Sequence, residues 1–313
     1  MHLLSEFRYP TRWYSKLIVG LLAVTFFTLV AAGIIAGYVV YSIIVLPAGG
    51  NATINLEGFP GQPEDLTYTV AGVGARDGWF FPGLKSAPTI LLCPGYRASR
   101  GELLPLATAL QDHEYNVFLF DFDRIGSSAG HATFGFRELQ ELRAAVSAMA
   151  RRPDVDRSRF GLWGTNMGAY TATALAESDP RVRAIAVESV YDRPEDMVRL
   201  LGSRYGLGSI ALLRSLAERS FLLLNYQDSK TPPLSARLSE LAGVAKLFIE
   251  AADEPGLIES THQLFVASPD PKEEVMLPQG NYAGMLDDEK RTYENRIVSF
   301  FLLSLPPEVR ARE

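Results

Sequence analysis

The stretch that decides the fold is Phe160-Gly161-Leu162-Trp163-Gly164-Thr165-Asn166-Met167-Gly168. An apolar run ends at one glycine, and a second glycine opens a small-residue pattern typical of a helix. This order predicts a strand, a sharp turn and a helix, with the middle residue of the turn held in strained backbone geometry above a sheet. That residue is Asn166, whose carboxamide donates and accepts hydrogen bonds but offers no reactive oxygen.

The regions on either side of this turn alternate between two patterns. Apolar runs predict strands at 89–93, 116–120, 183–187, 246–250 and 273–277, and helical patterns cover 102–110, 136–150, the stretch from the turn to about 177, and 292–305. Such alternation predicts a mostly parallel sheet with helices on both faces.

Two segments fall outside this alternation. Short strands are expected at 66–70 and 79–81, with residues 75–78 as the turn between them. Residues 191–240 contain apolar helical stretches and a proline-rich turn. They predict a helical lid over the turn at Asn166, and the alternative is an ordinary crossover with an extra helix.

The N-terminal region predicts a membrane anchor. Residues 17–46 are almost wholly apolar, and no charged residue occurs between Lys16 and Glu57. A span needs about 20 such residues, whereas signal-peptide cores have about 7–15, so a transmembrane helix is favoured over a cleaved signal. Arg8, Arg12 and Lys16 precede the run and predict a cytoplasmic N-terminus.

The expected domains follow from this anchor. Residues 1–16 form the cytoplasmic N-terminus, 17–46 the transmembrane helix and 47–63 a linker rich in glycine and proline. Residues 64–313 form a globular domain on the extracytoplasmic side of the membrane. The lipid bilayer is therefore the expected partner of residues 17–46, and small residues along that helix make a second membrane protein a further candidate partner.

Composition excludes several other classes of protein. The chain has 30 Lys and Arg against 36 Asp and Glu, a net charge of -6, so no basic surface for nucleic acid is expected. Its single cysteine, Cys93, excludes an internal disulfide. We predict no cofactor and no metal ligands from the sequence.

Several motifs, taken in order, carry a resemblance to a known family. They are the loop Pro94-Gly95-Tyr96, the loop 121–127, the segment 130–135, the glycine-flanked turn 164–168, the loop Ala251-Ala252-Asp253-Glu254-Pro255 and the loop 278–284. Together they resemble the α/β-hydrolase family, especially its prolyl-oligopeptidase-like and acyl-esterase-like branches. The resemblance implies an α/β-hydrolase fold from about residue 66 to residue 305, here preceded by one transmembrane helix.

The resemblance also implies places for a nucleophile, a base and an acid. The nucleophile position holds Asn166 where the family has serine, and the base position holds Asn281 or Tyr282 where it has histidine. Asp253 or Glu254 fills the acid position. The triad is therefore degenerate, and we assign no catalytic residue.

The resemblance also implies two backbone N–H donors, which do not depend on the identity of a side chain. The loop containing Gly95 brings the N–H of Tyr96 to the site, and the N–H of Met167 follows the nucleophile position. In the family such amides form the oxyanion hole, so a polar pocket with two donors is expected even without a nucleophile.

Other residues at the same sheet edge are weaker candidates. His131 is the one histidine expected on a loop at this edge, where it could act as a substitute base. His113 falls in a helix-to-strand turn far from this edge, His262 lies on the helix after the acid loop, where it either faces solvent or packs, and His2 precedes the anchor. Glu188 and Asp192 follow the next strand and are further acids near the pocket. Ser99 and Ser127 are expected to be turn formers or helix caps rather than nucleophiles.

Three hypotheses for function follow. The first is a membrane-anchored protein with a hydrolase fold that lacks serine-hydrolase catalysis and acts in binding. The second is an active hydrolase of a small ester or acyl substrate with a non-standard catalytic set, using His131 with Asp253 or Glu254. The third is a subunit of a membrane complex held by residues 17–46.

Overall fold

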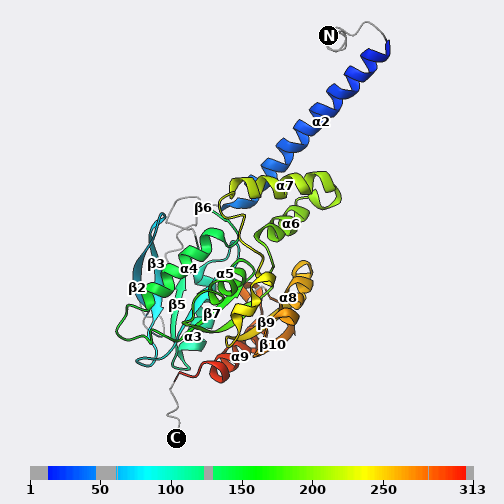
Figure 1. Cartoon of the computed structure of the whole chain (residues 1–313). Coiled ribbons are helices and arrows are strands. Elements are labelled where there is room, and N and C mark those ends of the chain that lie inside the picture. Colours follow the sequence, from blue (N-terminus) through cyan, green and yellow to red (C-terminus); the bar gives the residue numbers. More distant parts are fainter. Residues whose placement is uncertain (1–12, 47–60, 62, 123–129, 281, 308–313) are drawn as a thin grey trace. The chain divides into compact units, whose positions relative to one another are not determined.

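The computed structural model describes residues 13–46, 61, 63–122, 130–280 and 282–307. By the contacts of its backbone the chain forms two units, one of residues 1–43 and 198–229 and the other of residues 44–197 and 230–313. The first contains the N-terminal helix and most of the helical insertion, and the second contains the sheet and the candidate site (Figure 1).

The second unit is built on an eight-stranded sheet of order β10-β9-β8-β7-β4-β5-β3-β2. The strands are β2 (Glu64–Val70), β3 (Gly74–Phe81), β4 (Thr89–Cys93), β5 (Asn116–Phe120), β7 (Phe160–Thr165), β8 (Val182–Glu188), β9 (Ala245–Ala251) and β10 (Lys272–Leu277). Strands β4, β5 and β7 to β10 run parallel, and β2 and β3 are antiparallel to their neighbours. The parallel strands match the predicted ones within one or two residues.

Helices cover both faces of this sheet (Figure 1). One face packs on α3 (Leu104–Gln111) and α9 (Asp287–Ser304), in a core that includes Leu247 and Ile249 of β9. The other face packs on α4 (Phe136–Met149), α5 (Met167–Ala176) and α8 (Pro255–Ala267), where Phe265 of α8 meets Phe248 of β9. Residues adjacent in a strand point to opposite faces, which explains why β-strand runs here are apolar throughout.

The turn between β2 and β3 corrects one expectation. Residues 75–78 lie inside β3, and the chain reverses earlier, where the N–H of Val73 donates to the carbonyl of Val70 at 3.1 Å. Gly72 and Gly74 have φ of +73° and +112°, a conformation that glycine adopts freely. The earlier glycines therefore make the turn, and the charged pair Arg76 and Asp77 belongs to the strand.

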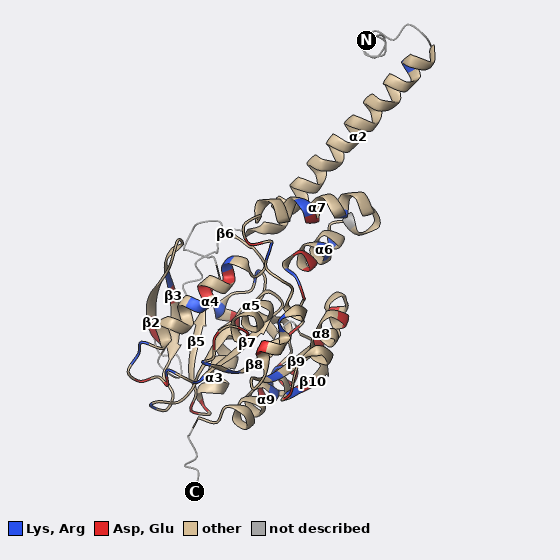
Figure 2. Ribbon diagram, in the orientation of Figure 1, with Lys and Arg blue, Asp and Glu red and all other residues tan. Residues whose placement is uncertain are grey.

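The first unit begins with α2 (Trp13–Ile44), the one helix of the described residues that is long and apolar enough to cross a membrane. Its most apolar 18-residue window has a mean hydropathy of 2.6. Along the described helix the only charge is Lys16, near its start (Figure 2). The helix was predicted at 17–46, but Val45 and Leu46 instead form a short strand, β1, antiparallel to β6 (Gly130–His131).

Residues 47–60 and 62, most of the predicted linker, lie outside the described residues. The insertion predicted at 191–240 contains α6 (Pro194–Arg204), η2 (Leu207–Ser209) and α7 (Ala211–Leu224), followed by η3 (Leu234–Ala236) and η4 (Leu238–Leu241). It is therefore helical, and its action as a lid stays a prediction.

Candidate functional site

The turn between β7 and α5, hereafter the elbow (residues 164–168), depends on its two glycines. A Cβ on Gly164 would lie 2.5 Å from the carbonyl carbon of Gly168, and one on Gly168 would lie 2.1 Å from the carbonyl oxygen of Cys93. Both are contacts with backbone, so neither position accepts a larger residue without moving the chain. The glycines thus let α5 start directly against the ends of β4 and β7.

Asn166 occupies the tip of the elbow in a strained conformation, with φ of 36° and ψ of -99°. Its backbone is held on both sides: the N–H donates to the carbonyl of Glu188 at 2.9 Å, and its own carbonyl accepts from the N–H of Tyr170 at 2.9 Å. Such strain costs about 1–3 kcal/mol and persists only where the surroundings impose it. The fold therefore presents the Asn166 side chain at this point at an energetic cost.

The Asn166 side chain fills the position on which two backbone amides converge. Its Oδ1 accepts from the N–H of Tyr96 at 2.7 Å and from the N–H of Met167 at 2.6 Å. Gly95 lies so close that an added Cβ would be 2.9 Å from Nδ2 and 3.0 Å from Oδ1 of Asn166. The two amides expected to form an oxyanion hole thus bind an oxygen of the protein itself.

Below the elbow lies a buried carboxyl group on the neighbouring strand. Glu188 ends β8, is only 2% exposed, and accepts at Oε2 from the hydroxyl of Tyr293 at 2.5 Å. The Tyr293 hydroxyl in turn accepts from Nε1 of Trp163 at 3.0 Å. Burial, chiefly, raises the pKa of Glu188 to about 8; the Tyr293 hydrogen bond opposes this rise, and the charges of Asp253 and Glu254 add to it.

The loops expected to carry the acid and the base meet above this carboxyl group. Oδ1 of Asp253 accepts from the N–H of Gly280 at 2.8 Å. A Cβ on Gly280 would lie 2.3 Å from Oε1 of Glu188, so the chain passes directly against that carboxylate. Asp253 and Glu188 therefore both contact Gly280, and the site is rich in acids.

The other residues expected at the base and acid positions lie in different places. Asn281 lies outside the described residues. Tyr282 is 3% exposed, its ring packs against those of Trp163 and Tyr293, and its hydroxyl donates to Glu294. Tyr282 is thus part of the core under α9 rather than a group at the elbow. Glu254 precedes α8 as its N-cap residue.

The described histidines occupy three different places. His131 is exposed on β6, opposite Val45 of β1. His113 is exposed at the end of α3, where its Nδ1 lies 2.8 Å from the carbonyl oxygen of Ala109. His262 is half-exposed on α8 beside Glu274 and Glu250.

The other candidates have local structural roles. Ser99 donates from Oγ to Glu102 at 2.9 Å at the start of a 3-10 turn, η1 (Arg100–Leu103). Asp192 accepts at Oδ1 from the N–H of Ser235, a residue of η3, at 2.7 Å. Ser127 lies outside the described residues.

Sequence reasoning missed the residues that support Glu188. Tyr293 and Trp163 were expected only as parts of a helix and a strand, yet their polar atoms form the chain that ends on the carboxylate. Ser189 was not singled out either. It has φ of 51° and a buried Oγ without a hydrogen-bond partner. No local pattern marks Tyr293 and Trp163, because their hydrogen bonds join segments more than 100 positions apart.

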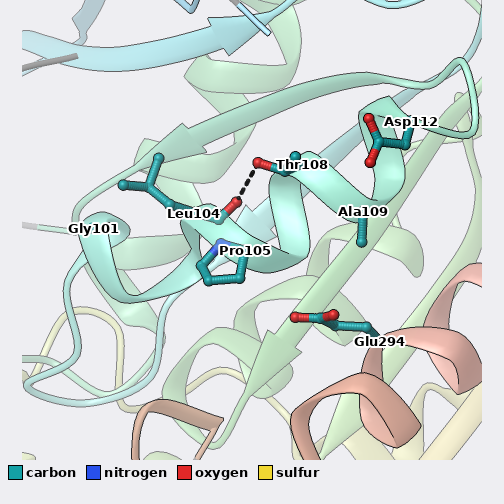
Figure 3. Close-up of a pocket in the computed structure, with 7 residues that line it drawn as sticks. All are labelled: Gly101, Leu104, Pro105, Thr108, Ala109, Asp112 and Glu294. Atoms are coloured by element: carbon teal, nitrogen blue, oxygen red, sulfur yellow. Dashed lines mark hydrogen bonds between the residues drawn. The ribbon is translucent and has the colours of Figure 1, made fainter. Parts of the chain in front are cut away.

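Two pockets lie away from the elbow. A groove of about 610 Å³ between α3 and α9 is lined by residues that include Pro105, Thr108, Asp112 and Glu294 (Figure 3). A smaller pocket of about 300 Å³ lies beside the 278–284 loop and reaches Tyr293. None of the residues predicted to form the candidate site lines either pocket.

Comparisons with known proteins agree with this architecture. No family model matches the chain. The uncharacterized protein YfhR of Escherichia coli (strain K12) is 23% identical over 80% of this chain and 84% of its own length. The polyketide transferase grgF of Penicillium sp is 31% identical over 41% of this chain, a match that spans 46% of that protein.

Solved structures show the same fold. The α/β hydrolase GrgF from Penicillium sp. sh18 aligns with a TM-score of 0.57 and 20% identity, over 78% of this chain and 99% of that one. The Pyrococcus furiosus esterase Pf2001 aligns with a TM-score of 0.65 and 18% identity, over 84% and 98%. The chain is therefore an α/β-hydrolase-fold protein, as the sequence predicted. The tip of its elbow carries the carboxamide of Asn166.

Proposed function

We propose that this chain is a membrane-anchored member of the α/β-hydrolase superfamily that acts in binding or complex assembly without serine-hydrolase catalysis. The observation that carries the proposal is the pair of hydrogen bonds from Tyr96 and Met167 to Oδ1 of Asn166, at 2.7 and 2.6 Å. Amides of this kind accelerate acyl transfer by stabilising the negative oxygen of a substrate. Here they are satisfied by the side chain that replaces the nucleophile.

The chemistry at the elbow supports the same conclusion. A neutral carboxamide neither loses a proton near neutral pH nor attacks a carbonyl carbon. Tyr282, one of the two residues at the base position, is buried in the core with its hydroxyl on Glu294. An enzyme that loses members of its Ser-His-Asp triad retains only about 10³–10⁴-fold acceleration over water. That remaining activity depends on an open oxyanion hole.

The acidic groups around Gly280 favour a second candidate, an active ester or acyl hydrolase with an unusual catalytic set. Glu188 has a pKa near 8, in the range expected of a general acid or base, and Asp253 contacts the same glycine. The similarity to esterases of the same fold agrees with this alternative. In it, His131 or one of these acids would activate water rather than a side-chain nucleophile.

Labelling with a fluorophosphonate probe tests the proposal on the full-length chain in detergent micelles, with an active serine hydrolase as the positive control. The native chain and Asn166→Ala are both expected to remain unlabelled. Labelling of the native chain that survives Asn166→Ala would overturn the assignment of the elbow as the vacant nucleophile position.

Turnover of a panel of short acyl esters separates the two candidates. The proposal predicts no hydrolysis above the buffer rate. Hydrolysis by the native chain that is lost in His131→Ala, Asp253→Asn or Glu188→Gln would establish the active alternative. His113→Ala is the matched control, since His113 is an exposed histidine bonded to the carbonyl of Ala109 at the end of α3.

The anchor and the partner form the remaining part of the proposal. Helix α2 carries the chain in a bilayer, and the basic residues before it keep the N-terminus in the cytoplasm. A stable partner in the same membrane is expected to co-purify in mild detergent. Replacing α2 with an unrelated apolar span of equal length is expected to release that partner, whereas retention of the partner would assign the contact to the globular unit.

A further inference from the structure

A cluster of one histidine and two glutamates lies on the sheet face covered by α8. Glu250 of β9 is opposite Met276 of β10, and Glu274 comes two residues before Met276. Because side chains alternate along a strand, Glu250 and Glu274 project on the same face. His262 reaches them from α8, which packs on that face through Phe265 and Phe248.

The distances within this cluster suit a small cation. Nδ1 of His262 lies 2.9 Å from Oε1 of Glu274 and 3.4 Å from Oε1 of Glu250, and the three donor atoms lie within 4.8 Å of one another. Ligands held tetrahedrally at 2.0–2.2 Å from an ion are separated by roughly 3.4 Å. The two distances from His262 are therefore close to those that two ligands of one ion would have.

A second observation points to a missing ligand. The Glu250 side chain is only 7% exposed, and its Oε1 is buried without a hydrogen bond, since the nearby Nδ1 of His262 is 3.4 Å away and is hydrogen-bonded to Glu274 instead. A buried carboxylate oxygen without a donor is costly, and metal coordination is one of the ways in which proteins satisfy such a group. The His262 side chain is 49% exposed, so the site is open to solvent on that side.

We propose that Glu250, His262 and Glu274 bind a divalent transition-metal ion, with Zn²⁺ as the best fit. One imidazole and two carboxylates are a donor set that zinc accepts, whereas Mg²⁺ and Ca²⁺ take six or more oxygen ligands. The ion has three protein ligands, and water completes its coordination on the exposed side. It joins the edge strand β10, its neighbour β9 and the covering helix α8.

This site goes beyond the proposed function and does not depend on it, because none of its three ligands belongs to the elbow. Nor does its sequence spacing resemble a zinc motif: the ligands are each separated by 12 positions and come from a strand, a helix and a strand. The sequence analysis predicted no metal ligands, and only the fold brings these three residues together.

The test is a zinc titration of the full-length chain in detergent, free of any histidine tag and stripped with a chelator, in competition with a chromophoric chelator at pH 7.5. The native chain is expected to bind one Zn²⁺. Both His262→Ala and Glu274→Gln are expected to lower the affinity by about 100-fold or more, since even outer-shell changes cost 10–100-fold. The matched control His113→Ala is expected to bind as the native chain does.

Thermal unfolding provides a second readout that also checks the folding of each variant. Zinc at a large excess over its dissociation constant raises the Tm of a protein that binds it only when folded, so the native chain and His113→Ala are expected to gain Tm. A native chain that binds no stoichiometric zinc would overturn the proposal and leave an internal ion pair only. Equal affinity in a folded His262→Ala would overturn it as well.

Discussion

Asn166→Ala removes the one side-chain oxygen that binds both amides at the elbow. The substitution leaves the N–H groups of Tyr96 and Met167 without their acceptor. Loss of an N-cap oxygen costs about 1 kcal/mol, and the net loss of the second hydrogen bond adds about 1 kcal/mol. We therefore expect the free energy of unfolding to fall by about 2 kcal/mol, or a Tm lower by about 4–8 °C for a unit of this size.

Two further substitutions at Asn166 separate the oxygen from the backbone strain. Asn166→Asp keeps an acceptor facing both amides and is expected to stay within about 1 kcal/mol of the native chain, because charge-assisted bonds offset repulsion from nearby acids. Asn166→Gly loses the oxygen but relieves the strain at φ of 36°, so it is expected to be more stable than Asn166→Ala.

The assay is thermal unfolding of the full-length variants in one detergent, followed by the near-ultraviolet circular dichroism of the buried aromatic core. The reasoning is refuted if Asn166→Ala is as stable as the native chain. It is refuted equally if Asn166→Asp loses as much stability as Asn166→Ala, because the oxygen would then contribute nothing.

Three other predictions concern the sheet, the elbow and the anchor. The folded state raises the pKa of Glu188 from 4.5 to about 8, so it retains a proton that the unfolded chain releases, and stability falls as pH rises through this window. Between pH 5 and pH 8, the free energy of unfolding of Glu188→Gln is therefore expected to rise relative to that of the native chain by about 2–4 kcal/mol. Unfolding curves of the two proteins at each pH measure this difference. A difference that does not change with pH would contradict the raised pKa of Glu188. Gly168→Ala is expected to destabilise the chain by at least about 3 kcal/mol or prevent its expression, because its Cβ meets the Cys93 carbonyl at 2.1 Å, whereas Gly20→Ala, with nothing within 4 Å, is expected to be silent. The full-length chain is expected to remain in the membrane pellet after an alkaline carbonate wash, and extraction by that wash would argue against α2 as a span.

Much of the sheet was predictable because its signals are local. Continuous apolar runs placed the parallel strands within one or two residues, and the glycines of the elbow fixed the strand, turn and helix around Asn166. The β2–β3 turn was misplaced because polar Arg76 and Asp77 looked like a loop. Arg76 is in fact buried and paired with Glu141 at 3.1 Å, a partner 65 positions away.

The identity of the candidate site stays a prediction, and the arrangement of its residues could not be predicted from the sequence. The sequence shows an asparagine at position 166, yet nothing in it indicates that the carboxamide turns its oxygen toward the amides of Tyr96 and Met167. The pKa of Glu188 depends on the burial imposed by the fold and on the tertiary contacts that bring Tyr293, Asp253 and Glu254 near it. Such properties belong to tertiary contacts and have no local pattern.

The junction between α2 and β1 has a mechanical consequence. The helix ends at Ile44, and the next residue, Val45, already pairs with His131, so no spacer is available there to absorb motion. The chain continues from His131 to Thr133, whose N–H and hydroxyl both donate to Glu138 of α4, at 2.8 and 2.5 Å. The link from the end of α2 to the start of α4 therefore runs through ordered, hydrogen-bonded residues.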